Sequence, residues 1–283
     1  MLRKLSILFF IALVVSQAEA NYNFAVHTDS HPWAREDAKG AQEEIDTLIK
    51  NIENKVNLEA FDPKDIKGLA DWVAAHTEGG GNTLILTGIT PSTIYPTGNA
   101  KRDGSLLEEF LDAGNTVFNT GEYTFYTSEG PAETNGQEAL PAIIDVPEAF
   151  VWMGRGPDAW QAAPVEMTPT QEGKDLIPSL KKYNTSYPFH VEDYEKSPWE
   201  VEIALAENKD DDLRIEPAVI FNEETGGRLG IFVQTYVGDV PHPGVSWGAI
   251  MGEFIVNYYL PEVLSVEPTD KLTTTWGKLK SPY

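Results

Sequence analysis

Hydrophobic positions in the first half of the chain follow two alternating spacings. Four short apolar runs have the length expected of buried strands: 23–27, 56–61, 83–87 and 116–119. Between them, apolar residues recur every three or four positions, which predicts three helices: over 34–55, from 62 towards the glycines at 79–81, and over 103–113. This alternation predicts an α/β fold, a three-layer sandwich whose mostly parallel, flavodoxin-like central sheet carries helices on both faces.

Two polar residues mark positions where helices are expected to begin. Asp62 is followed by Pro63, a combination typical of an N-cap and a first helical residue. Ser246 precedes an apolar helical segment over 247–260 and is expected to cap it. Residues 244–248 also spell G-x-S-x-G, but the hydrolases with that motif need a histidine later in the chain, and none follows Ser246.

Beyond residue 122 the pattern is less regular. A helix is expected within 168–180, opening at Thr170. Strands are expected at 201–206, 218–221 and 229–236, the last two joined by a glycine-containing turn. Because no repeat or linker divides the chain, we expect one domain over 21–262 and a polar tail over 263–283.

The first 20 residues have the features of a secretory signal peptide. Arg3 and Lys4 are followed by an apolar run over 5–15, and Ala18-Glu19-Ala20 matches the small-x-small cleavage pattern. The apolar run is shorter than the roughly 20 residues that span a bilayer. We therefore expect cleavage after Ala20, a secreted or periplasmic protein, and no membrane anchoring after cleavage.

Composition excludes several classes of function. The formal charge of −23 opposes binding to nucleic acids and to anionic lipid surfaces. The chain contains no cysteine, which excludes thiol nucleophiles, thiol redox chemistry and cysteine zinc sites. The oligomeric state is not indicated by any pattern.

Four segments resemble a known superfamily. Residues 84–88, 106–114 and 116–121 read as a strand, a helix with the spacing hhxxFhxxG, and a strand ending in a sharp turn; residues 227–236 read as a late strand. Together they resemble the class I glutamine amidotransferase-like superfamily, particularly its trehalose-utilisation-like branch. Catalytic members place a cysteine after the fourth strand, where this chain has Asn119-Thr120-Gly121-Glu122. The resemblance thus implies an amidotransferase-like scaffold without the amidotransferase chemistry.

One polar cluster has the residue types of a metal site. His27, Asp29 and His31 lie just beyond the first predicted strand, at the end where open α/β sheets place ligands. In an extended segment alternate side chains point the same way, so two imidazoles and a carboxylate would face a divalent cation. A hydrogen-bonded turn that simply ends the strand is the alternative interpretation.

A second group combines aromatic and acidic residues. Glu122, Tyr123 and Tyr126 follow the fourth predicted strand, while Tyr95 and Trp33 follow the third and the first. Aromatic faces with carboxylates suit a sugar or a cationic amine. The alternative interpretation is ordinary aromatic packing in the core and at its rim.

Two functions follow from these patterns. The first is a non-catalytic binding or structural module with a small-molecule ligand such as a carbohydrate, with no catalytic residue and no cofactor. The second is a metal-dependent hydrolase that uses His27, Asp29 and His31, with Glu122 as a base. The sequence favours the first, because the further metal ligands that such hydrolases need have no counterpart in the chain.

Overall fold

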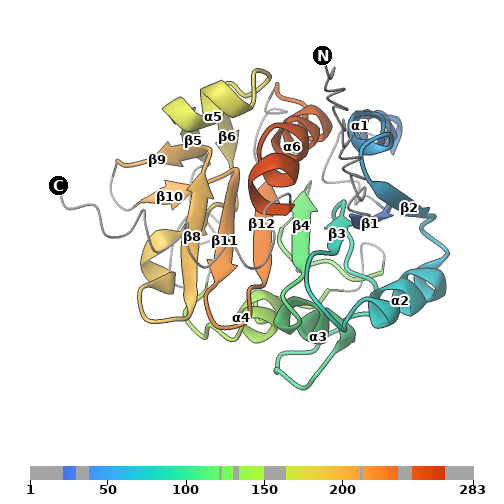
Figure 1. Ribbon diagram of the computed structural model, residues 1–283. Helices are drawn as coiled ribbons and strands as arrows, with labels where there is room; N and C mark the ends of the chain where they lie inside the picture. Colours follow the sequence, from blue (N-terminus) through green and yellow to red (C-terminus); the bar gives the residue numbers. More distant parts are fainter. Residues whose placement is uncertain are drawn as a thin grey trace, which may run out of the picture.

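The computed structural model describes residues 22–29, 38–120, 123–129, 134–149, 164–210, 213–234 and 244–264. Its centre is a seven-stranded sheet of order β2-β1-β3-β4-β12-β11-β8 (Figure 1). The strands are β1 (Asn23–His27), β2 (Asn57–Phe61), β3 (Thr83–Leu86), β4 (Thr116–Thr120), β8 (Trp199–Ala204), β11 (Ala218–Asn222) and β12 (Arg228–Phe232). Neighbours from β2 to β12 pair in parallel, whereas β11 is antiparallel to β12 and β8. The predicted mostly parallel sheet is confirmed.

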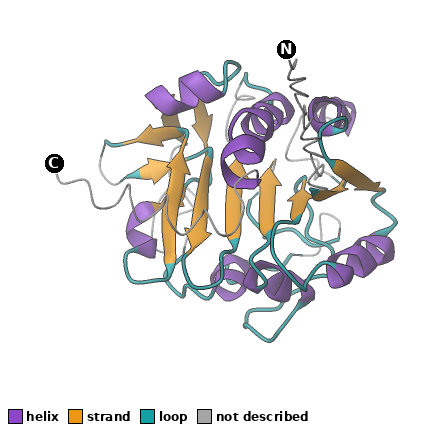
Figure 2. Cartoon of the chain, in the orientation of Figure 1, coloured by secondary structure: helices purple, strands orange, loops and turns teal. Residues whose placement is uncertain are grey.

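Helices cover both faces of this sheet (Figure 2). The helices α1 (Ala38–Ile52) and α6 (Trp247–Phe254) lie on one side, and α6 continues as a π-helix over Ile255–Leu264. On the other side lie α2 (Ile66–Ala75), α3 (Leu106–Asp112) and α4 (Ala139–Ile144). Alternate residues of β1 divide between the two cores: Phe24 and Val26 pack towards α1 and α6, and Ala25 packs towards α2 and α3.

Close packing between α1 and α6 depends on glycine. A Cβ atom added at Gly248 would lie 2.1 Å from Glu44 O, and one at Gly252 would lie 2.6 Å from Asn51 Nδ2. The Glu44 carboxylate accepts hydrogen bonds from Gly248 N and Ser246 Oγ. It thereby satisfies a backbone N–H group at the start of α6 and places a negative charge there. These contacts fix α6 against α1 directly above the central strands.

A second sheet extends from the far edge of the first and was not predicted. It has five strands in the order β6-β5-β9-β10-β7, all antiparallel. The strands are β5 (Val165–Pro169), β6 (Tyr183–Thr185), β7 (Phe189–His190), β9 (Ala206–Asn208) and β10 (Arg214–Ile215); α5 (Gln171–Leu176) and a 3-10 helix (Val191–Tyr194) accompany it. Only Leu205 separates β8 from β9, so the single strand expected at 201–206 in fact bends from one sheet into the other.

The observed starts of three helices can be compared with the N-cap residues predicted from the sequence. Ser246 accepts a hydrogen bond from Ala249 N and Thr170 accepts one from Gly173 N, so both predicted N-caps are confirmed. The predicted cap at Asp62 is wrong: α2 is capped by Asp65, which accepts from Gly68 N. Asp62 instead closes a turn before the helix, where its backbone carbonyl accepts from Asp65 N.

In the described part of the chain, no helix is both long enough and apolar enough to span a bilayer.

Candidate functional site

The carboxyl ends of the parallel strands meet at one edge of the large sheet. From β1 the chain crosses to β2 on one side, and β3 leads to β4 on the other, so the strand order reverses between β1 and β3. Open α/β sheets bind ligands in the crevice at such a reversal. The sequence placed its candidate residues at this edge, and we call it the carboxyl edge.

At the end of β1, His27 is fully buried. Neither ring nitrogen reaches hydrogen-bonding geometry with any described residue, while its backbone carbonyl accepts from Thr87 Oγ1 at 2.9 Å. Burial lowers the pKa of His27 to about 4, against smaller opposing effects of the Ile89 backbone and of the Asp62 and Glu129 carboxylates. The ring is therefore neutral at neutral pH, and the Ile89 backbone is near it without forming a hydrogen bond of good geometry.

Three carboxylates lie around this end of β1. Burial raises the pKa of Asp29, and the charges of Asp62 and Glu129 raise it further. Glu129 accepts hydrogen bonds from the backbone and hydroxyl of Ser92, with a distance of 3.0 Å from Ser92 N. The region is thus acidic and repels anions.

The predicted metal cluster is only partly visible. His27 and Asp29 both lie at the carboxyl edge, as expected, whereas His31 lies outside the described residues. Within the described ranges no group of three or more histidine, cysteine, aspartate or glutamate side chains is arranged to hold a metal ion.

Of the predicted aromatic group, Tyr123 and Tyr126 come together. Their rings stack at 4.7 Å between centroids, and Tyr187 stacks on Tyr123 at 4.6 Å. Tyr123 is the middle ring, so both of its faces are covered, and Tyr126 and Tyr187 are the end rings of the stack. Tyr187 follows β6 and had no signal in the sequence, since it lies more than sixty residues along the chain from its partners.

Of the other predicted aromatic and acidic residues only Tyr95 is described, and it does not join this stack. Tyr95 is fully buried in the core, and its hydroxyl donates to Asn99 O at 2.7 Å. Burial raises the pKa of Tyr95 above its usual value. Trp33 and Glu122 lie outside the described residues.

A further buried polar group joins β4 to the end of β12 and was missed by the sequence reasoning. The Gln234 side-chain amide donates to Asn119 O and to Asn119 Oδ1, each at 3.0 Å. The Gln234 backbone N–H donates to the carboxyl group of Glu216, which lies between β10 and β11. No spacing or motif could have linked these three positions, because they are brought together by β4, β12 and the bend between the two sheets.

Glu216 is held in its neutral form. It is fully buried, and burial raises its pKa to about 8, against the hydrogen bonds of Thr185, Gln234 and Tyr183. Thr185 Oγ1 lies 2.8 Å from Gln234 O and also hydrogen-bonds the Glu216 carboxyl. Because a threonine hydroxyl has one proton and a carbonyl oxygen only accepts, a protonated Glu216 satisfies both contacts.

Backbone strain also gathers at the carboxyl edge. Among the described residues, Phe125, Asp145 and Val233 are the non-glycine residues with positive φ. Asp145 ends α4, an ordinary place for a left-handed residue. Phe125 and Val233, at φ values of 62° and 53°, follow β4 and β12. Positive φ is rare for bulky and β-branched residues and is often retained at functional sites.

The opposite, amino edge of the sheet is built differently. Asparagines stand at or just before the starts of β2, β1, β3 and β4, and their side chains form one chain: Asn57 donates to Asn23 at 2.9 Å, Asn23 to Asn82 at 3.1 Å, and Asn82 to Asn115 at 3.0 Å. The Asn115 amide then donates to His76 O and Phe110 O. We call this row the asparagine ladder.

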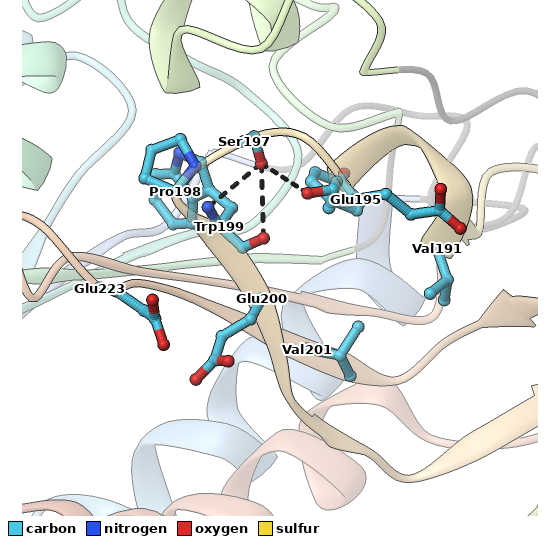
Figure 3. A pocket seen from close by; sticks show the side chains of 9 residues that line it. Val191, Glu195, Ser197, Pro198, Trp199, Glu200, Val201 and Glu223 are labelled. Carbon is cyan, nitrogen blue, oxygen red and sulfur yellow. Dashed lines mark hydrogen bonds between the residues drawn. The ribbon is translucent and has the colours of Figure 1, made fainter.

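A hollow of about 290 Å³ opens at the amino edge. It is lined by Trp199 at the start of β8 and by Glu223 just after β11 (Figure 3). Burial raises the pKa of Glu200, and the nearby Glu223 raises it further. Trp199 Nε1 donates to Ile144 O at 2.8 Å, so this polar group of the wall is already hydrogen-bonded.

Comparison with known proteins finds similar solved structures but identifies neither a family nor a function. No family model matches the sequence, and no curated protein matches it. Similar solved structures include a ThuA-like protein from Bacteroides uniformis ATCC 8492, with 11% identity over 84% of this chain and 91% of that one and a TM-score of 0.44. Another is the glutaminase domain of Trypanosoma brucei CTPS with bound acivicin, with 9% identity over 84% and 94% of the two chains and a TM-score of 0.39. At these values function has to be argued from the residues of this chain.

Proposed function

We propose that this chain is a secreted, non-catalytic binding protein with an amidotransferase-like scaffold, and that it binds a carbohydrate at the carboxyl edge. The observation that carries the proposal is the gathering there of buried hydrogen-bonding groups and stacked tyrosines, away from the well-bonded amino edge. Three steps support it: the scaffold, the missing nucleophile and the chemistry of the edge.

The scaffold is supported by where the resembling segments lie. Residues 84–88, 116–121 and 227–236 include β3, β4 and β12, which are consecutive neighbours in the sheet, and 106–114 includes α3. Segments far apart in the sequence thus form one continuous part of the fold. The order β2-β1-β3-β4-β12 is also that of flavodoxin-like doubly wound sheets.

Among the described residues at the end of β4, no side chain is set up to act as a nucleophile. The chain has no cysteine, and the hydroxyl nearest to that position, Thr120 Oγ1, is buried and donates to Phe232 O. A hydroxyl needs an adjacent base to become a nucleophile. Its proton is here committed to a backbone carbonyl, which supports a binding role over an acyl-transfer role.

The ligand class follows from charge and shape. Asp29, Asp62 and Glu129 make the edge acidic and oppose phosphate or carboxylate ligands. Tyr126 is an end ring of the three-ring stack and is only partly buried, and an aromatic face of this kind is a surface on which a sugar ring packs. A neutral carbohydrate meets both conditions.

A glycan array probed with the purified protein tests this proposal. We expect binding to uncharged glycans that weakens at least tenfold in Tyr126→Ala. The matched control is Tyr22→Ala, because Tyr22 immediately precedes β1 at the amino edge. No binding across a diverse array, or equal weakening in both variants, contradicts the proposal.

Export is part of the proposal because of the first 20 residues. Expression in a secreting host should release a protein whose first residue is Asn21, as read by intact mass. Retention of the full-length chain inside the cell would argue against a secreted function. Replacing the apolar run 5–15 with polar residues is the matched control and should abolish release.

The second candidate function, a metal-dependent hydrolase, is favoured by one observation: His27 is neutral, buried and without a partner on either ring nitrogen in the described structure. A neutral imidazole is what a metal binds. Stoichiometric zinc or manganese in the purified protein, lost in the double variant His27→Ala/His31→Ala, would establish this function and displace the first.

A further inference from the structure

The contact between Gln234 and Asn119 leaves two buried groups unused. Asn119 O can only accept, so the NH₂ group of Gln234 must face it, and this fixes which way the Gln234 amide lies. The same NH₂ group donates to Asn119 Oδ1, which fixes the Asn119 amide as well. The remaining atoms are Gln234 Oε1, an acceptor, and Asn119 Nδ2, a donor.

Neither atom has a hydrogen-bond partner in the described part of the chain. Both side chains are at most 1% exposed, so water at the protein surface does not serve them. Leaving a buried donor and a buried acceptor unpaired costs stability, and native proteins rarely tolerate it without a ligand, an ordered water or a functional reason. Each atom belongs to an amide that takes part in the same 3.0 Å hydrogen bond, so the two lie close together.

A third unused group comes from another segment. The hydroxyl of Ser186 is buried and has no partner in the described ranges, while Ser186 N donates to Gln234 O at 3.2 Å. Its neighbour in the sequence, Tyr187, stacks on Tyr123, which follows β4. Two of the three segments that contribute these polar atoms thus also carry the tyrosine stack.

No charged side chain among the described residues forms a hydrogen bond with these three atoms. Glu216, which holds the Gln234 backbone, is kept neutral by complete burial, and no described lysine, arginine or histidine contributes to its environment. An anion would face the bare acceptor Gln234 Oε1, and a cation would face the NH₂ group of Asn119. An uncharged group that both donates and accepts matches both atoms.

We propose that Asn119 Nδ2 and Gln234 Oε1 form a subsite for an uncharged hydroxyl or primary amide of the ligand, with Ser186, whose backbone is bonded to Gln234, as a further contributor. The inference rests on the proposed function, because it assigns the part of the ligand that this edge recognises. Glu216 and Thr185 act as positioning residues, since they hold the Gln234 backbone without reaching the ligand.

The side-chain amide signals of the ¹⁵N-labelled protein test the subsite directly by NMR. The probes are acetamide, acetate and acetamidinium, which have nearly the same shape and differ in charge, together with ethylene glycol as a hydroxyl probe. We expect acetamide and ethylene glycol to shift the Asn119 NH₂ signals saturably, with acetate and acetamidinium at least tenfold weaker. Asn115, at the other end of β4, is the internal control and should not shift.

Asn119→Leu, which removes both polar atoms at nearly constant size, should abolish the shift that acetamide causes in the Gln234 NH₂ signals, while the Asn115 signals keep their positions. If that variant fails to fold, the titration of the wild-type protein still tests the subsite. Unshifted Asn119 signals, as expected for a site that holds only water, overturn the subsite, and so does an equal response to acetate. The glycan array decides the proposed function separately: array binding with unshifted Asn119 signals leaves that function standing without this subsite.

Discussion

The two ends of the parallel strands use the same kinds of residue in opposite ways. At the amino edge, the asparagine ladder joins four amides whose donors and acceptors serve neighbouring strands. At the carboxyl edge, Asn119, Gln234 and His27 are equally buried but keep unused donors or acceptors in the described structure. The difference indicates a structural role for the polar groups of the amino edge, and it is the basis for the ligand contact that we propose at the carboxyl edge.

The largest effect should come from the buried acid at the carboxyl edge. In the unfolded protein Glu216 loses its proton near pH 4.5, whereas burial raises its pKa in the folded protein to about 8. The free energy of unfolding of the wild type therefore falls as the pH rises from 4.5 to 8 and levels off above pH 8. In Glu216→Gln, whose amide imitates the protonated acid, this fall should be absent. The difference between the two proteins should grow by about 5 kcal/mol across that window.

Urea unfolding of both proteins at several pH values between 4.5 and 8.5 measures this difference. Subtracting the two curves removes the titration of all other groups. If the two free energies of unfolding differ by the same amount at every pH, Glu216 ionises normally. The contrast between the two edges would then lose its strongest chemical support.

The next largest effect should come from the asparagine ladder. Asn115→Leu leaves His76 O, Phe110 O and the Asn82 side chain without their partner, and we expect a loss of about 3 kcal/mol in the free energy of unfolding. The loss should not depend on pH, because no titratable group belongs to the ladder. Asn57→Ala, at the exposed end of the same ladder, is the control and should cost less than about 1 kcal/mol.

The smallest effect is expected for His27→Leu. This change removes a buried ring whose nitrogens have no partner among the described residues, so it should alter the free energy of unfolding at pH 7 by less than about 1 kcal/mol and in the stabilising direction. Calorimetric unfolding at pH 7 beside Asn115→Leu provides the measurement. If both variants lose similar amounts, polar groups at the two edges are equally structural and the comparison fails.

Much of the large sheet could be read from the sequence because its strands are short apolar runs separated by amphipathic helices. Thr170 and Ser246 were also predicted as caps, because capping depends on residues three or four positions apart. Asp62 misled the prediction since Asp65 offers the same side chain three residues later, and the turn between them decides which one caps the helix.

The second sheet escaped prediction for a different reason. Its strands are two to five residues long, and β9 and β10 are set off from β8 and β11 only by a bend. Segments this short show no reliable alternation of hydrophobic and polar residues. They are stabilised by pairing with distant strands, as Val165 pairs with Thr185. For the same reason Tyr187 and Glu216 gave no sign of their positions.

By itself the sequence determined the parallel strands, the shared edge at their carboxyl ends and the absence of thiol chemistry, because hydrophobic period and residue inventory are local properties. Only the tertiary structure decided which groups meet at that edge. It placed Gln234 on Asn119, stacked Tyr187 on Tyr123 and buried Glu216 without a cation. Hydrogen bonds and burial between residues distant in the chain depend on how strands pair in space, and no spacing along the sequence encodes that.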